Sequence, residues 1–378
     1  MLLAGILCAC DDRRQKSELP VIPTTPAENG PSYELDLQPL TPLTPNRTTH
    51  VAADPLGNIC WLQETESADD TVFIMGEGQI PRVSDLTTSR VADTINGGRG
   101  ATGRIQSIAA GRGGEIYFYF IGRSGKRLIA ALGLYTPKNS RIRILADADA
   151  LKDASGLGAS VALARGTLYS NNACVWLWLR HSDDSSLFRL RHTDIPAAGS
   201  PRLAESLMSV TIQDQKVSLT DDDYNFAPAG DDTLFWMDTD ESELRQIDGL
   251  GRVKTVRSLI GLPVALSAPV RGDQGKLLMF AGDAPIMEAQ HIGQVDAQRV
   301  RLNVKYPAML MFAGGGAPGQ PVRAVGADSF VIYSGFPLST MRIRNLIPEA
   351  KGGTWIAYDP SSGELLRLRL REKASPMP

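Results

Sequence analysis

One local pattern recurs along most of this chain and constrains its fold more than any other feature. An apolar pair leads into a turn rich in Gly and Asp, and a β-branched or aromatic run follows. The clearest copies span residues 51–61 and 108–118, and weaker copies span 161–169, 226–236, 270–280, 322–333 and 347–355. Two strands around such a turn form a hairpin, so the pattern predicts repeated antiparallel strands.

The spacing of the hairpins indicates how these strands are organised. Seven copies recur at a mean spacing close to the 40–50 residues that are typical of propeller blades. A small sheet of this kind cannot bury both faces alone, so we expect the sheets to stack radially around a channel. The sequence predicts an all-β β-propeller over residues 46–378, with seven blades, or six as the next choice. Two β-sandwiches are the competing fold, which the lack of a domain break after residue 50 disfavours. Helices are expected only at 146–154 and 201–208.

The last hairpin carries a resemblance to known propellers. In residues 355–366, Asp359 and Gly363 bracket a turn between two apolar runs. This stretch resembles a blade of the NHL and quinoprotein-like propellers. The quinoprotein pattern has Trp near position 367, where this chain has Arg367. The resemblance covers one blade, so it implies the fold and no cofactor.

Arginine alternates with an aliphatic residue in a second recurring element. The copies are Arg141-Ile142-Arg143, Arg189-Leu190-Arg191, Arg299-Val300-Arg301, Arg342-Ile343-Arg344 and Arg367-Leu368-Arg369. Successive side chains of a strand point to opposite faces, so the pattern predicts half-exposed outer strands with the arginines in solvent. An anion-binding arginine ladder is the alternative interpretation.

The N-terminus predicts export and a lipid anchor. Residues 1–9 are apolar or small, as in the end of a signal peptide, and are too short to span a bilayer. The stretch Leu7-Cys8-Ala9-Cys10 resembles the bacterial lipobox, which implies lipidation at Cys10 and cleavage before it. Cys8 departs from the small residues usual at its position, and no Lys or Arg precedes the apolar run. We expect the body to lie in the cell envelope, facing the periplasm or the exterior.

A proline-rich stretch follows the expected anchor. Residues 10–45 contain seven spaced prolines and predict a semi-stiff tether. Within it, residues 33–37 alternate between polar and apolar side chains. This run predicts a strand that joins the last blade and closes the ring.

Composition disfavours nucleic acid as a partner. The formal net charge is −3, and no long basic run occurs. Binding to phosphates requires concentrated Lys and Arg. The chain also lacks a CxxC pair, so Cys60 and Cys174 are expected to be buried free thiols, with a disulfide between them as the alternative.

Motifs for catalysis, metals or cofactors are weak. Gly98, Gly100 and Gly103 match GxGxxG, but residues 104–108 after them read as a strand, whereas a dinucleotide site needs a helix. A second match at 314–319 runs into prolines. Acidic residues gather at 221–241 without EF-hand spacing. We therefore expect no cofactor, metal or catalytic residue that the sequence can name.

The histidines and the aromatic runs have structural interpretations. None of the four histidines lies in a nucleophile motif, and they are expected to be surface or capping residues; they are His50, His181, His192 and His291. The runs at 117–120 and 175–179 are expected to pack blades together rather than to form a sugar platform.

The sequence thus predicts a non-catalytic propeller on a membrane that binds a protein, peptide or glycan. The alternative is a propeller enzyme of the lyase, lactonase or hydrolase type with its site at the channel mouth. An enzyme is expected to gather carboxylates or a histidine with perturbed pKa values at one mouth, whereas a binding module is expected to present an apolar patch.

Overall fold

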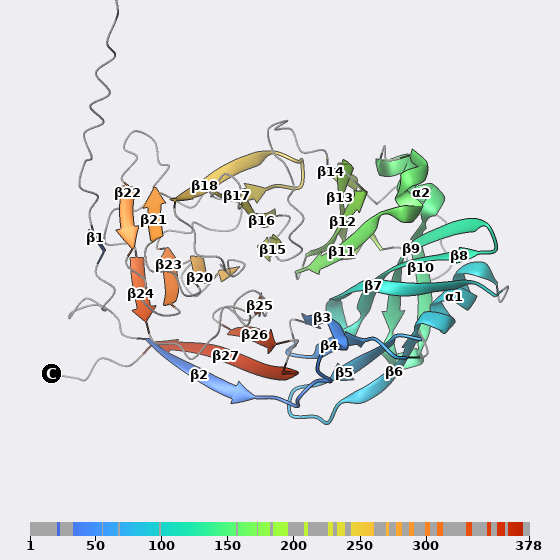
Figure 1. Cartoon of the computed structure of the whole chain (residues 1–378), viewed down its shortest axis with the longest axis horizontal. Helices are drawn as coiled ribbons and strands as arrows, with labels where there is room; N and C mark the ends of the chain where they lie inside the picture. Colours follow the sequence, from blue (N-terminus) through green and yellow to red (C-terminus); the bar gives the residue numbers. More distant parts are fainter. Residues whose placement is uncertain are drawn as a thin grey trace, which may run out of the picture.

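The computed structural model of this chain arranges its strands in six sheets around a centre (Figure 1). The structure describes residues 21–22, 33–54, 56–66, 69–97, 100–155, 158–171, 173–181, 184–195, 208–210, 226–229, 233–238, 243–260, 270–271, 277–281, 287–290, 299–302, 308–312, 330–334, 346–348, 354–359 and 362–372.

The first three sheets each contain four consecutive strands in antiparallel order. The first holds β3 (Thr48–Ala53), β4 (Ile59–Gln63), β5 (Thr71–Met75) and β6 (Arg82–Thr87). The second holds β7 (Thr102–Ala110), β8 (Ile116–Ser124), β9 (Arg127–Thr136) and β10 (Arg141–Asp147). The third holds β11 (Arg165–Ser170), β12 (Cys174–His181), β13 (Asp184–Arg191) and β14 (Met208–Val210).

The other three sheets complete the circle. The fourth runs from β15 (Phe226–Ala229) through β16 (Thr233–Asp238), β17 (Glu243–Ile247), β18 (Val253–Ile260), β21 (Met287–Gln290) and β22 (Arg299–Leu302) to β1 (Val21–Ile22). The fifth holds β19 (Val270–Arg271), β20 (Leu277–Ala281), β23 (Ala308–Phe312) and β24 (Phe330–Ser334). The sixth holds β25 (Leu346–Pro348), β26 (Thr354–Asp359), β27 (Glu364–Glu372) and β2 (Tyr33–Pro39).

The first strands of these sheets line the centre. β3 contacts β7, β7 contacts β11, β11 contacts β15, and β15 contacts β19. β25 of the last sheet contacts β3 of the first. Each later strand of a sheet therefore lies farther out, and the sheets radiate like blades. The chain is a β-propeller, as predicted. The blade number stays a prediction, although the described strands form six sheets.

The ring is closed by a strand from near the N-terminus. β2 is the expected strand at 33–37, and it pairs antiparallel with β27 from Tyr33 opposite Glu372 to Pro39 opposite Leu366. β2 therefore forms the outer strand of the last sheet, although it lies within residues 10–45. The limits of the signal peptide and the tether stay predictions.

Side chains also join the last sheet to the first. Nη2 of Arg367 donates to the carbonyl oxygen of Gly57 at 2.9 Å, and the Tyr358 hydroxyl donates to the carbonyl of Thr48. Gly57 has φ +84°, a left-handed conformation that glycine adopts without strain. The tight turn between β3 and β4 thus lies within reach of the arginine.

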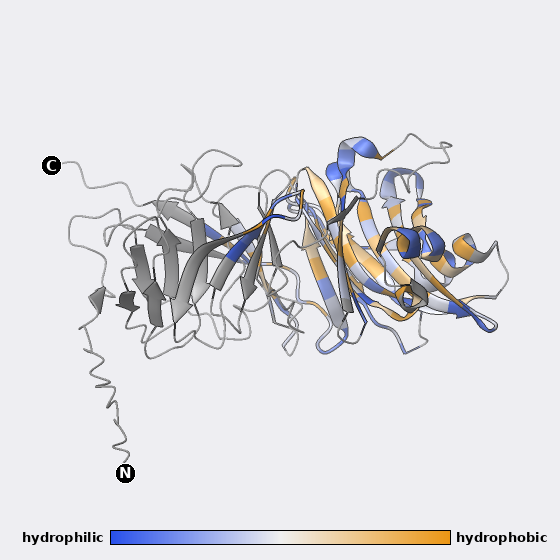
Figure 2. Ribbon diagram, turned by 90° about the horizontal axis from the view of Figure 1, so that it is seen from above, coloured by the Kyte–Doolittle hydropathy of each residue, from blue (hydrophilic) through white to orange (hydrophobic). Residues whose placement is uncertain are grey.

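Hydrophobic side chains fill the spaces between neighbouring sheets. On β8, Phe118 and Phe120 pack toward the first sheet, while Tyr117 and Tyr119 pack toward the third. All four are fully buried because the period of two directs them alternately to two covered faces. Figure 2 shows the hydrophobic residues along the strands of these neighbouring sheets. Aromatic runs therefore pack blades together, as expected.

The cysteines and tryptophans behave as core residues. Cys60 and Cys174 are buried and not joined by a disulfide, which confirms the interpretation as apolar core residues. Trp176 and Trp178 lie in one cluster with Leu234 and Ile247 of the next sheet. The aromatic residues of β12 thus lie at a blade interface, as their shared strand face predicts.

Two described helices lie in connections between sheets. α2 (Ala148–Ser155) confirms the helix expected at 146–154. Residues 201–207 of the other expected helix lie outside the described residues, and Met208 begins β14. α1 (Thr88–Asn96), which sequence reasoning did not predict, begins after Thr87, whose side chain accepts from the Arg90 N–H, and ends at Gly97 with φ +61°. The remaining short 3-10 turns are η1 (Arg112–Gly114), η2 (Pro137–Asn139), η3 (Gly158–Leu163) and η4 (His192–Asp194).

The arginine pattern requires a correction. Arg141 begins the outermost strand of its sheet and is exposed, as expected. Arg189 and Arg367 are only 5% and 9% exposed, so the prediction of solvent-facing arginines is wrong for both. They lie on β13 and β27, each beside a fourth strand, and they reach Gly249 and Gly57 of the next sheets. Period-two alternation is the same on an outer strand and on the strand beneath it.

Within the described ranges, no helix combines the length and the apolar character that crossing a bilayer requires.

Candidate functional site

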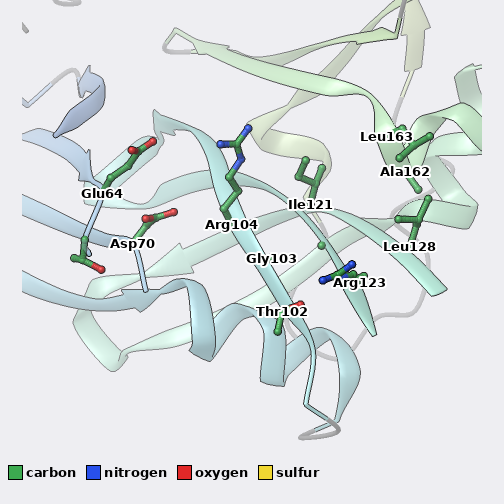
Figure 3. A pocket seen from close by; sticks show the side chains of 12 residues that line it. Glu64, Asp70, Thr102, Gly103, Arg104, Ile121, Arg123, Leu128, Ala162 and Leu163 are labelled. Atoms are coloured by element: carbon green, nitrogen blue, oxygen red, sulfur yellow. The ribbon is translucent and has the colours of Figure 1, made fainter. Parts of the chain in front are cut away.

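A pocket of about 510 Å³ opens between the first two sheets, beside η3 in the connection from the second sheet to the third. It is lined by the β4–β5 loop, by the ends of β7, β8 and β9, and by η3 (Figure 3). Strands in an antiparallel sheet alternate in direction, so these segments all lie at the same end of their strands. The topology therefore brings residues 64 and 163 to one place.

The floor of the pocket depends on two glycines. Gly103 and Gly122 pair across β7 and β8. A Cβ atom on Gly103 would lie 2.3 Å from the carbonyl oxygen of Ile121, and one on Gly122 would lie 2.3 Å from that of Thr102. Gly103 of the GxGxxG match thus permits close strand pairing. β7 contains Gly103 and continues through residues 104–108, which confirms the expected strand where a dinucleotide site would need a helix.

Two carboxylates border the pocket on the side of the first sheet. Glu64 is exposed, whereas Asp70 is only 6% exposed. Asp70 accepts from the backbone N–H of Thr65 and, at 3.5 Å, from the Thr88 hydroxyl. The adjacent Asp69 accepts from the Ser89 N–H at 2.8 Å, in the first turn of α1. The helix N-terminus therefore holds this loop in place.

Burial makes Asp70 an unusual acid. Desolvation, and secondly the charge of Glu64, raise its pKa above the ordinary range, while Arg104 and the two hydrogen bonds oppose the shift. A carboxyl group with a raised pKa in a cleft is a recognised feature of functional sites.

Two arginines occupy the middle of the pocket. Arg104 lies on β7 and Arg123 on β8, and both are exposed. Figure 3 shows Arg104 between the carboxylates on one side and Arg123 on the other. Neither guanidinium forms an ion pair with the described residues, although the charge of Arg104 acts on Asp70.

The far wall is apolar. Leu128 of β9 is 41% exposed and Leu163 of η3 is 55% exposed, and Ile121 and Ala162 complete the wall. Leucines with this much exposure offer area that a ligand can cover. The pocket thus combines acidic, basic and apolar parts within one opening.

The histidines that the sequence analysis considered are not among the described residues that line the pocket. His192 is half-buried, and its Nε2–H donates to the carbonyl oxygen of Asn171 at 2.8 Å, while its Nδ1 lies 2.6 Å from the Tyr117 hydroxyl. Desolvation is the main cause that lowers its pKa. His192 therefore caps the β11–β12 turn, as expected. His50 and His181 are half-buried in strands, and His291 lies outside the described residues.

The remaining sequence candidates lie at the N-terminus and in the second half of the chain. Cys8 and Cys10 lie outside the described residues, as do the second glycine match and most of the acidic stretch at 221–241. In the part of the chain that is described, no group of three or more His, Cys, Asp or Glu side chains could hold a metal ion.

Replacing Asp70 tests the cost of its burial. We expect Asp70→Asn to raise the free energy of unfolding at neutral pH, because the amide mimics the protonated acid. The folded-state pKa is raised, so the wild type pays no penalty below the ordinary Asp pKa. The loss of stability in the wild type begins as the pH rises above the ordinary Asp pKa, and it reaches its full size above the folded-state pKa of Asp70. Urea unfolding measures the free energy of unfolding of the wild type and of Asp70→Asn from neutral to acidic pH. The difference between the two proteins should disappear at acidic pH.

Asp93→Asn is the matched control, because Asp93 is exposed on α1. We expect it to leave the free energy of unfolding unchanged within about 0.5 kcal/mol. A less stable Asp70→Asn protein at neutral pH would show that the two hydrogen bonds outweigh the desolvation of the carboxylate.

Comparisons with known proteins describe the fold only. No protein-family model and no curated protein matches this chain. Among solved structures, an uncharacterized protein from Listeria monocytogenes has 9% identity and a TM-score of 0.42, covering 90% of this chain and 100% of that one. Regucalcin, a calcium-binding protein from Agrobacterium tumefaciens, has 8% identity and a TM-score of 0.42 over 89% and 94%. The WD40 domain of coronin from Toxoplasma gondii has 10% identity and a TM-score of 0.41 over 90% and 87%. This chain is similar to these proteins in its overall arrangement, and no activity is carried over from them.

Proposed function

We propose that this chain is a lipid-anchored binding module of a bacterial cell envelope, and that it captures a protein or peptide segment in the pocket. The observation that carries the proposal is the presence of exposed arginines and exposed leucines in one opening. A ligand that covers the leucines gains apolar burial, while the arginines fix its orientation through charge-assisted hydrogen bonds.

The composition of the wall favours a peptide over a glycan. Sugars stack on exposed aromatic rings, and no aromatic side chain is among the described residues that line this pocket. The large aromatic side chains of β8 and β12 are buried between sheets instead. Leucine and isoleucine side chains at the wall suit the apolar side chains of a polypeptide.

Selection from a random peptide library tests the binding function. We expect the purified protein to enrich a consistent set of peptides, and the double variant Leu128→Asp/Leu163→Asp to lose them. Burial of a leucine contributes roughly 1.5–3 kcal/mol, so binding should weaken about tenfold or more. Leu250→Asp is the matched control, because Leu250 is 62% exposed and lies outside the pocket. Equal enrichment by the pocket variant and the wild type would contradict the proposal.

Labelling with a palmitate analogue tests the anchor. In a bacterial host, we expect the full chain to incorporate label and to sediment with membranes, and Cys10→Ala to lose both properties. Cys8→Ala is the matched control and should keep both, since the lipobox places the acylated thiol at Cys10. Label that depends on Cys8 instead, or on neither cysteine, would refute the anchor at Cys10.

An enzyme of the lyase, lactonase or hydrolase type is the second candidate. Asp70, with its raised pKa in a pocket that also holds arginines, favours it. Turnover of an ester or lactone that Asp70→Asn abolishes would support this alternative over the binding module.

A further inference from the structure

The register of the second sheet groups the pocket residues into a compact pattern. Arg123 of β8 is paired with Thr102 of β7 on one side and with Leu128 of β9 on the other. Two residues earlier on β8, and on the same face, Ile121 is paired with Arg104 and with Ala130. Residues paired across antiparallel strands share a face, so these side chains form two adjacent rows of mixed charge and hydrophobicity.

The rows place an arginine beside a leucine at short range. Cβ atoms of directly opposed residues in an antiparallel pair lie roughly 4.5–5.5 Å apart. Arg123 and Leu128 are such a pair, and Leu163 of η3 lines the same pocket. A ligand that satisfies both residues must carry its anionic and apolar groups at a similarly short separation.

The charges of the pocket do not cancel at this position. Arg104 lies toward the buried Asp70, whose carboxylate feels its charge. Arg123 is exposed, and it forms no ion pair with the described residues. The positive charge beside Leu128 is therefore available to an incoming anion.

We infer that the pocket selects extended polypeptide segments in which an acidic residue lies two positions from a bulky aliphatic one, with the acid at Arg123 and Arg104 and the aliphatic group at Leu128 and Leu163. This inference rests on the proposed binding of a polypeptide and specifies its ligand. Successive residues of an extended segment turn to opposite sides, so an acid and an aliphatic residue two positions apart would both reach the same face of the sheet.

Fluorescence anisotropy with labelled synthetic peptides tests the selectivity. The probes are nine-residue peptides in which Leu-Gly-Glu-Gly-Leu, Leu-Gly-Gln-Gly-Leu or Leu-Gly-Lys-Gly-Leu is flanked by Ser and Gly. We expect the Glu peptide to bind the wild-type protein at least about tenfold more tightly than the Gln peptide, and the Lys peptide to bind more weakly still. The affinity for the Glu peptide should fall as salt concentration rises.

Variants identify the groups responsible for the preference. Arg123→Gln and Arg104→Gln should each reduce the preference for Glu over Gln several-fold while leaving the affinity for the Gln peptide within about twofold. Arg141→Gln is the matched control and should keep the preference, because Arg141 is exposed on β10 outside the pocket. The far-ultraviolet circular dichroism spectrum confirms that each variant is folded.

The outcomes separate this inference from the proposed function. Equal affinity for the three peptides would overturn the selectivity and leave polypeptide binding in place. Absence of binding to all three would also overturn it, and the library selection would then report on polypeptide binding by itself. A labelled oligogalacturonate that binds, with no peptide binding and no library enrichment, would overturn both in favour of an anionic glycan.

Discussion

Removal of residues 1–40 is expected to abolish cooperative folding of this propeller or to lower its stability by several kcal/mol. The truncation deletes β2, which pairs with β27 over the full length of seven residues. It also removes the backbone bond from the Leu40 N–H to the carbonyl of Leu365, at 2.9 Å. Each hydrogen bond contributes about 0.5–1.5 kcal/mol net, and a whole domain has only about 5–15 kcal/mol of stability.

The lost strand also leaves β27 as a new sheet edge. An exposed edge with unpaired backbone groups promotes association between chains, so we expect the truncated protein to aggregate. Thermal unfolding followed by circular dichroism, together with light scattering, measures both effects.

Removal of residues 1–32 is the matched control. It deletes β1, as the longer truncation also does, but retains β2, so we expect an unfolding midpoint well above that of the longer truncation. Equal midpoints for the two truncated proteins would show that β2 does not contribute to ring closure, and the closure would then depend on side-chain contacts such as Arg367 with Gly57.

Trp176→Ala is expected to destabilise the protein by about 3–5 kcal/mol, which is the usual cost of removing a buried aromatic side chain. Trp176 is completely buried and lies between the third sheet and residues Leu234 and Ile247 of the fourth. Neither sheet can move in to fill the space, because each is held by its neighbours around the ring. Urea unfolding, with the midpoint and slope compared with those of the wild type, measures the loss.

Trp176→Phe separates lost volume from lost hydrogen bonding. Within the described structure, Nε1 of Trp176 has no hydrogen-bond partner, so replacement of the indole by a phenyl ring removes no hydrogen bond. We expect a loss of less than about 1.5 kcal/mol, as for other conservative changes of core shape. A loss from Trp176→Ala below about 1 kcal/mol would contradict packing at this interface as a main source of stability.

Much of the architecture was predictable from short-range patterns. The apolar pairs, Gly/Asp turns and aromatic runs at 51–61 and 108–118 became the β3–β4 and β7–β8 hairpins. The alternation at 33–37 became β2. These signals are local, because a strand and its turn are specified by adjacent residues. α1 was missed, although Thr87 and Gly97 are suitable cap residues ten positions apart.

The pocket left almost no trace in the sequence. Its acidic, basic and apolar parts come from two sheets and from η3, between Glu64 and Leu163, and no spacing rule connects them. The one local signal is the β8–β9 hairpin, whose Gly125 turn sets Arg123 opposite Leu128. That pairing could have been suggested from the sequence, but the exposure of the Arg123 and Leu128 side chains could not.

By itself, the sequence determined the strands, their turns and the radial repeat, because each depends on residues close together in the chain. The tertiary structure decided which strand faces become interfaces and which remain open. Arg189 and Arg123 both occur in alternating strands, yet Arg189 is buried between blades and Arg123 is exposed in a pocket. The difference arises because burial depends on what the neighbouring sheet places opposite each residue, which the period of a single strand does not encode.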